Sequence, residues 1–445
     1  MNTTMSLLFL PIVVALMIGG MGLVKMAAAR FGWSAEIQRK LVHISTGLFA
    51  MCLPWLLPQS WLVYLLLGLA VGVMLVLRIP AIATRGIGTA LHGVERKSWG
   101  DLMLVAAVAT LYFKSNSGTE PVLYLLPLAV LTLSDAAAAL AGSAYGRMHF
   151  AVEDGQKSIE GSAIFFLITW ILAMVALLLL SDIDREKVVI LSLMTAAFAT
   201  VIEADSWRGF DNYFVPVGVL FIVTNHANSS QLELVLLALS FVAILILMNT
   251  FGTKYLGLSK HTARAYTASI FMITAVTEVQ NLILPLTVLL VQTWTRSVRP
   301  SNTNHPDLDV LAMLATVSFI SLIGGQVMGL SAISFYQIVC ANLAIQFLIL
   351  ALADRSKAIK ISALLAAISV AMGILIFVWS LNGAVSSWHR DLIYFAPIVM
   401  LLTAALPLLR PAFFDQDRYL KTGLLAAIPM TIAYLIEFQI AGAAL

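Results

Sequence analysis

Residues 122–146 read VLYLLPLAVLTLSDAAAALAGSAYG, an apolar run in which Asp135 is the single charged residue. A helix of roughly 20 apolar residues crosses about 30 Å of hydrocarbon, so this run is long enough to span a membrane. An ionisable side chain at such depth is costly to bury unless it is paired or hydrated, and it is commonly functional. The stretch therefore predicts a membrane helix and marks Asp135 as a candidate functional residue.

The composition of the whole chain supports the same class. Of 445 residues, 60% are hydrophobic and only 11% are charged, whereas soluble domains have about 25% charged and 45–50% apolar residues. The excess apolar surface must face lipid. The net charge of +3 is too small and too dispersed for a nucleic-acid partner. Cys52 and Cys340 lie in apolar runs, which argues against a disulfide framework or a thiolate metal site.

The same length criterion identifies sixteen candidate spans along the chain. They are residues 6–25, 41–57, 61–79, 101–113, 122–146, 159–181, 188–204, 213–226, 232–252, 263–278, 281–295, 310–330, 334–353, 361–383, 392–409 and 422–441. Met1 to Gly20 lacks the basic start of a cleaved signal, so we expect it to be a retained first span. The predicted fold class is all-α, a polytopic integral membrane helix bundle.

The distribution of Lys and Arg predicts how the bundle is oriented. Residues 263–294 are too long for one crossing, and Glu278, Gln280 and Asn281 divide them into a hairpin. With that division and both termini outside, the inner loops hold 22 of the 26 Lys and Arg residues and the outer loops hold 4. This asymmetry satisfies the positive-inside rule and favours both termini outside.

Acidic residues are concentrated in one part of the chain. Ten of the 23 lie between 135 and 211, whereas the second half has few ionisable groups inside its spans. We therefore expect a catalytic membrane domain at 1–228 and an additional multi-span domain of unknown role at 229–445. The site is expected on the cytoplasmic face, because this topology places four of its candidate residues there, namely Lys157, Glu203, Asp205 and Asp211.

Two motifs follow Asp135. Gly142 and Gly146 form a small-xxx-small pattern, which is typical of helix packing. Lys157 and Ser158 precede the span at 159–181, where a helix N-terminus, a hydroxyl and a lysine together favour an anion such as phosphate. The alternative is that Ser158 only caps the helix while Glu160 occupies its first turn.

Three further acids lie on the same predicted face. Glu203 and Asp205 end one span, and Asp211 begins the next. Carboxylates beside a phosphate-binding lysine suggest Mg²⁺, which takes oxygen ligands and bridges nucleotide phosphates. Phosphoryl transfer requires mainly positioning and charge neutralisation, which such a group of residues supplies. The alternative is that these acids are simply solvated at helix ends.

Taken together, these residues resemble the CTP-dependent polyprenol kinase family, which includes phytol kinases, dolichol kinases and CTP-using diacylglycerol kinases. The resemblance covers about 30–225 and rests on four motifs in order, which are Arg39-Lys40-x-x-His43, Asp135-x-x-Ala-x-x-x-Gly142-x-x-x-Gly146, Lys157-Ser158-x-Glu160-Gly161, and Glu203 followed by Asp211-Asn212-x-x-x-Pro216. Ser134 stands where the family usually has glycine, a difference that bears on helix packing.

The resemblance implies transfer of the γ-phosphate of CTP, or of another nucleoside triphosphate, to the hydroxyl of a lipid alcohol taken from the bilayer. Lys157 would hold nucleotide phosphates, while Asp135, Glu203 and Asp211 would ligate Mg²⁺ or accept the hydroxyl proton. The other motif residues are expected to contact nucleotide or lipid, namely Arg39, Lys40, His43, Gly142, Gly146, Ser158, Glu160, Gly161, Asp205 and Asn212. For His43, a structural hydrogen-bonded histidine is an equal alternative.

Two other functions remain open at the level of sequence. CTP-dependent phosphatidate cytidylyltransferases carry similar aspartate, glycine and lysine motifs, but they usually continue into a Pro-Gly-His-Gly ending that this chain lacks. A multi-span transporter is the second alternative, suggested by the many spans and favoured further by a second half that matches no known family. Against it, the carboxylates gather at one face rather than at the midplane of two matching halves.

Overall fold

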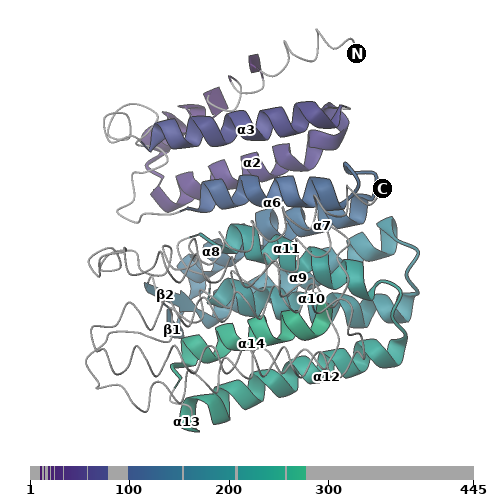
Figure 1. Ribbon diagram of the computed structural model, residues 1–445. Coiled ribbons are helices and arrows are strands. Elements are labelled where there is room, and N and C mark those ends of the chain that lie inside the picture. The colour runs from purple at the N-terminus through teal and green to yellow at the C-terminus, as the bar shows by residue number, and fades with distance from the viewer. Residues whose placement is uncertain are drawn as a thin grey trace, which may run out of the picture. The chain divides into compact units, whose positions relative to one another are not determined.

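The computed structural model is helical over most of the part that it describes (Figure 1). It divides into two compact units, Met1–Phe241 and Val242–Leu445, and the division falls within one helix. The described residues are 11–12, 15, 19–20, 22–24, 26–33, 35–57, 59–78, 99–152, 155–205, 209–255 and 258–276. The predicted spans from 281 onward, the division at Glu278 and both chain ends lie outside these ranges.

The first unit contains the helices that carry the motifs. Its elements are α2 (Ala35–Leu56), α3 (Ser60–Leu77), α6 (Gly100–Lys114), α7 (Pro121–Ala129), the π-helical turn η1 (Val130–Ser134), α8 (Asp135–Tyr145), α9 (Ile159–Leu180), α10 (Arg185–Ala204), α11 (Asp211–His226) and most of α12 (Gln231–Leu247). The second unit includes η2 (Met248–Gly252), α13 (Thr253–Tyr255) and α14 (Lys260–Val276). These bounds confirm the expected helices within the described ranges.

Within the described ranges, four helical segments are long and apolar enough to cross a membrane. They are Pro121–Tyr145, Ile159–Leu180, Arg185–Ala204 and Gln231–Tyr255. In lipid every backbone N–H and C=O must be bonded inside the segment, so apolar runs of this length become helices. α9 exposes large aliphatic side chains such as Leu167, Ile171 and Val175. These exposed apolar faces, together with the helix lengths, indicate a membrane protein.

Helix α10 is largely buried in the first unit. It packs against α9 and α11, and its buried side chains include Leu191, Phe198 and Ala199. Phe198 also meets Phe241 of α12 edge to face, with ring centroids 6.2 Å apart. Glu203, near the end of α10, is thereby carried into the interior of the bundle.

The segment that begins at Pro121 contains a π-helical turn directly before Asp135. One extra residue in a helix shifts everything after it by about 100° around the axis, and such turns are frequent at functional sites. The Ser134 hydroxyl, fully buried in this turn, accepts a hydrogen bond of 2.9 Å from the Thr169 hydroxyl of α9. The turn therefore sets the direction of Asp135, and the serine that departs from the family's glycine ties two helices together.

The all-α prediction requires one correction. Strands β1 (His149–Val152) and β2 (Gly155–Ser158) pair antiparallel between α8 and α9, with Phe150 opposite Lys157. Gly155 has φ +131°, a conformation that a side chain would disfavour. A four-residue strand is too short to show a clear alternation of polar and apolar residues, so the sequence pattern does not predict this hairpin. It holds Lys157 directly before α9.

Candidate functional site

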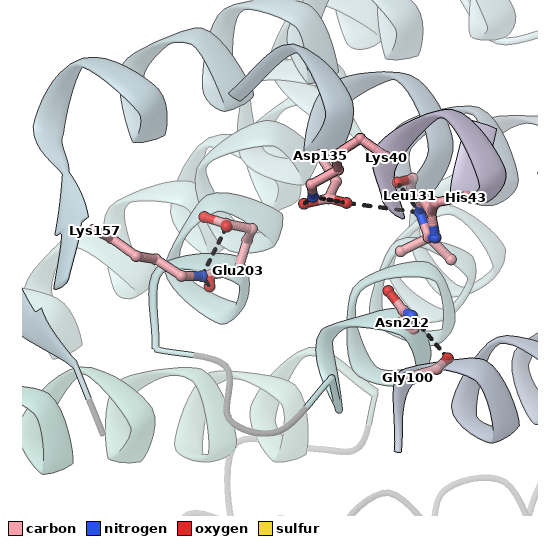
Figure 2. Close-up of polar contacts among 8 residues, drawn as sticks. All are labelled: Lys40, His43, Gly100, Leu131, Asp135, Lys157, Glu203 and Asn212. Atoms are coloured by element: carbon pink, nitrogen blue, oxygen red, sulfur yellow. Dashed lines mark hydrogen bonds and ion pairs between the residues drawn. The ribbon is translucent and has the colours of Figure 1, made fainter. Parts of the chain in front are cut away.

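A buried ion pair joins Lys40 of α2 to Asp135, the first residue of α8. The Lys40 ammonium lies 2.7 and 2.6 Å from the two carboxylate oxygens, and both side chains are almost fully buried (Figure 2). His43 Nε2 lies 3.3 Å from the Leu131 carbonyl and 3.6 Å from an Asp135 oxygen. A buried charge requires a partner, and Lys40 is that partner for Asp135.

The spacing on α2 explains how the contact forms. Lys40, His43 and Gly47 are three and four residues apart and share one helix face. At Gly47 a Cβ atom would lie 2.1 Å from the Thr132 hydroxyl oxygen, so only glycine allows α2 this close to η1. The glycine thus permits the approach that brings Lys40 and His43 to Asp135.

A second lysine and carboxylate pair lies at the start of α9. The Lys157 ammonium is 2.7 Å from Glu203 Oε1 and also donates to the Glu203 main-chain carbonyl (Figure 2). Burial by itself lowers the pKa of Lys157, but attraction to Glu203, Asp211 and Asp135 outweighs it and raises the pKa above its ordinary value. Lys157 therefore stays positively charged at neutral pH.

The two pairs act within one electrostatic environment. Asp135 and Asp211 both act on the charge of Lys157, although they come from different helices. The next residue, Asn212, donates its side-chain amide to the Gly100 carbonyl at 2.7 Å, which joins the starts of α11 and α6. Asp205 is buried at the end of α10. Glu203 therefore binds Lys157 directly, while Asp135 and Asp211 lie near enough to affect its pKa. The catalytic roles expected for these four residues stay predictions.

At the start of α9, several of the groups that were expected to bind an anion have partners within the protein. The Ser158 hydroxyl accepts the Gly161 N–H at 3.0 Å as the helix cap, and the Ile159 N–H donates to the Met148 carbonyl. Glu160 is directed toward Met148, whose N–H lies 3.2 Å from its carboxylate. These donors and acceptors serve the hairpin and the helix start, so Lys157 is the remaining candidate anion contact at this position.

The motif glycines have a packing role in this structure. A Cβ atom at Gly142 would lie 2.8 Å from Ser158 Oγ, and one at Gly161 would lie 3.0 Å from the Ala138 carbonyl oxygen. Gly146 is similarly close to the Gly142 carbonyl and to Ser158. Glycine at these positions lets α8 and α9 approach closely around the Ser158 cap. A direct contact of these glycines with nucleotide stays a prediction.

The remaining predicted ligands are less closely gathered. Arg39 is exposed, although the adjacent Lys40 is buried. Among the residues whose positions are described, no three His, Cys, Asp or Glu side chains are grouped closely enough to hold a metal ion. Asp135 and Glu203 each bind a lysine instead. Magnesium binding by Asp135, Glu203 and Asp211 stays a prediction.

The ion pair between Lys40 and Asp135 is a feature of the site that the sequence does not predict. The sequence does indicate that Lys40, His43 and Gly47 share one helix face, because they recur at helical spacing. The partner 95 positions away could not be read from that spacing.

The fold and the site together define a membrane helix bundle with lysine–carboxylate pairs inside it. The chain is 28% identical over 189 residues to the phytol kinase of Synechocystis sp., which covers 42% of this chain and 78% of that protein. No protein-family profile and no solved structure matches. This similarity supports a relationship between the first part of the chain and the polyprenol and phytol kinases.

Proposed function

We propose that this protein is a lipid-alcohol kinase that transfers the γ-phosphate of a nucleoside triphosphate to a long-chain isoprenoid alcohol. The observation that carries the proposal is the gathering of Asp135, Lys157, Glu203 and Asp211 from separate elements of an apolar bundle. The similarity to a phytol kinase supports the same chemistry. CTP as donor, and phytol or dolichol as acceptor, are the specific forms of the proposal.

Two lysine–carboxylate pairs, Lys40–Asp135 and Lys157–Glu203, contribute to the proposed reaction. In this proposal Lys157 binds phosphate oxygens, and an incoming triphosphate competes with Glu203 for its ammonium group. Asp135 accepts the proton of the lipid hydroxyl. Binding energy in such transfers goes mainly into positioning and charge neutralisation. Mg²⁺ is proposed as an ion that arrives with the nucleotide, since it commonly binds through one or two carboxylates together with substrate phosphates.

The location of the reaction follows from the substrates. A long-chain alcohol reaches the site laterally from the bilayer, whereas the nucleotide arrives from water. Lys157, Glu203 and Asp211 lie beside helix ends, whereas Asp135 lies within the apolar segment Pro121–Tyr145, so the proposed site extends from the water side into the lipid region. A multi-pass protein with this site on the cytoplasmic face is the arrangement we propose.

The test is a matrix of ATP, CTP, GTP and UTP against a panel of lipid alcohols, using membranes from an expressing host. We expect label from the γ-position of one nucleotide to appear in a lipid monophosphate. Label from the α-position of CTP in the lipid would instead indicate a cytidylyltransferase. Transfer in no combination, with the protein present and folded, would contradict the kinase assignment.

A further inference from the structure

The observed contacts of Lys40 differ from those that its motif implies. The resemblance places it among residues that contact phosphate or lipid headgroup. In the structure its ammonium lies within 2.7 Å of both oxygens of Asp135, and the two side chains are only 9% and 12% exposed. The charge of Lys40 is thus already matched by a carboxylate inside the bundle.

The surroundings hold this pair in one geometry. α2 is brought against η1 by the Gly47 contact with Thr132, and the π-helical turn directs Asp135 toward α2. His43, one helical turn after Lys40, lies against the Leu131 carbonyl of the same turn at 3.3 Å. Lys40, His43 and Gly47 of α2 therefore all lie against one stretch, residues 131–135.

Moving Lys40 to a phosphate would leave Asp135 ionised and without its partner at membrane depth. Such a charge is strongly unfavourable in a low-dielectric interior. Lys157 is less restricted, because its side chain is 26% exposed, against 9% for Lys40, and it lies in the short strand β2 before α9. Lys157 can therefore exchange its carboxylate partner for a nucleotide phosphate more readily than Lys40 can.

We propose that Lys40 is a positioning residue, which keeps Asp135 ionised and fixed in direction and acts on the reaction only through that carboxylate. This inference rests on the proposed function. In the transfer, the hydroxyl O–H bond breaks and its proton goes to an Asp135 oxygen. The alcohol oxygen bonds to the γ-phosphorus, and the bond from that phosphorus to the β-phosphate oxygen breaks, which releases a nucleoside diphosphate.

The first experiment separates positioning from phosphate binding by steady-state kinetics on the purified full-length protein. We expect Lys40→Met to lower kcat by about 100-fold or more, which is the range for loss of a positioned proton acceptor, while KM for the nucleotide changes less than about twofold. Lys40→Arg should recover part of kcat. A raised nucleotide KM with unchanged kcat would show a phosphate ligand and overturn the inference.

The second experiment exchanges the two partners. Lys40→Asp combined with Asp135→Lys retains an ion pair, so we expect it to melt at a higher temperature than either single variant and to remain inactive. Recovered turnover would show that the pair is only structural. If Lys40→Met does not fold, Lys40→Arg and the exchanged pair decide the question alone.

A matched control lies on the surface of the same unit. Lys187 and Asp184 form an ion pair of 3.0 Å in which Asp184 is largely exposed. Lys187→Met should change neither kcat nor KM. If the wild type is active and Lys40→Met changes the nucleotide KM with kcat unchanged, this inference alone is refuted. If the wild type transfers no phosphate, both the proposed function and this inference are refuted.

Discussion

Asp135 is the residue whose environment constrains the chemistry most strongly. It is nearly fully buried, and it is bound to one lysine, with a histidine close by. Asn has the same shape as Asp but cannot accept a proton, so the substitution isolates the chemical role from the packing role.

We expect Asp135→Asn to reduce phosphoryl transfer by about 100-fold or more, because a positioned proton acceptor contributes that much to rate. The measurement is γ-label incorporation into lipid by purified protein. Size-exclusion profile and helical content should match those of the wild type. Wild-type turnover in this variant would show that the site has been assigned to the wrong residue.

Lys157 gives a second prediction at the same scale. Lys157→Ala should abolish transfer and also destabilise the protein by about 1–3 kcal/mol, because Glu203 is left buried without its cation. Adding Glu203→Gln should restore part of the melting temperature but no activity. If the double variant regained turnover, Lys157 would not be a phosphate contact.

At the scale of elements, the close approach of α8 and α9 depends on small residues. We expect Gly161→Ala to destabilise the protein by about 1–3 kcal/mol, since its Cβ would meet the Ala138 carbonyl and Ser158. Gly72→Ala in α3 is the matched control, because no atom lies within 4 Å of that Cβ position. Thermal unfolding without nucleotide measures both, and Gly72→Ala should be neutral or slightly stabilising. Equal melting temperatures for the two variants would contradict the packing role.

The bond between Ser134 and Thr169 joins the π-helical turn to α9. Ser134→Ala or Thr169→Val leaves one buried hydroxyl without its partner, whereas the double variant removes both. A double-mutant cycle of unfolding free energies should therefore show a coupling of about 0.5–1.5 kcal/mol. A coupling near zero would mean that other groups satisfy these hydroxyls.

At the scale of the whole molecule, the boundary of the catalytic part can be tested by truncation. The predicted boundary at 228 precedes α12, yet Leu234 and Phe241 of α12 are buried and Phe241 packs on Phe198. We expect a chain ending after Tyr255 to be more stable in detergent than one ending at 228, and to retain some transfer activity. Complete loss of activity in a folded 1–255 chain would assign an essential role to the second part.

The helices and the candidate acids could be predicted from the sequence within the described ranges. The run predicted at 159–181 is α9, Ile159–Leu180, and the run at 188–204 lies within α10, Arg185–Ala204. Membrane helices are predictable because the lipid core requires each apolar segment to satisfy its own backbone hydrogen bonds. Ionisable residues in such runs are predictable as candidates for the same reason, since burying a charge is costly.

The choice of partners was decided by the tertiary structure. Lys40 pairs with Asp135 across 95 positions and Lys157 pairs with Glu203 across 46. Neither pairing follows from residue spacing, because it depends on how closely two helices approach and on how far one π-helical turn rotates the residues after it. The hydrophobic pattern determines which segments cross the membrane, but the contacts at Gly47, Gly142 and Gly161 determine which side chains then meet.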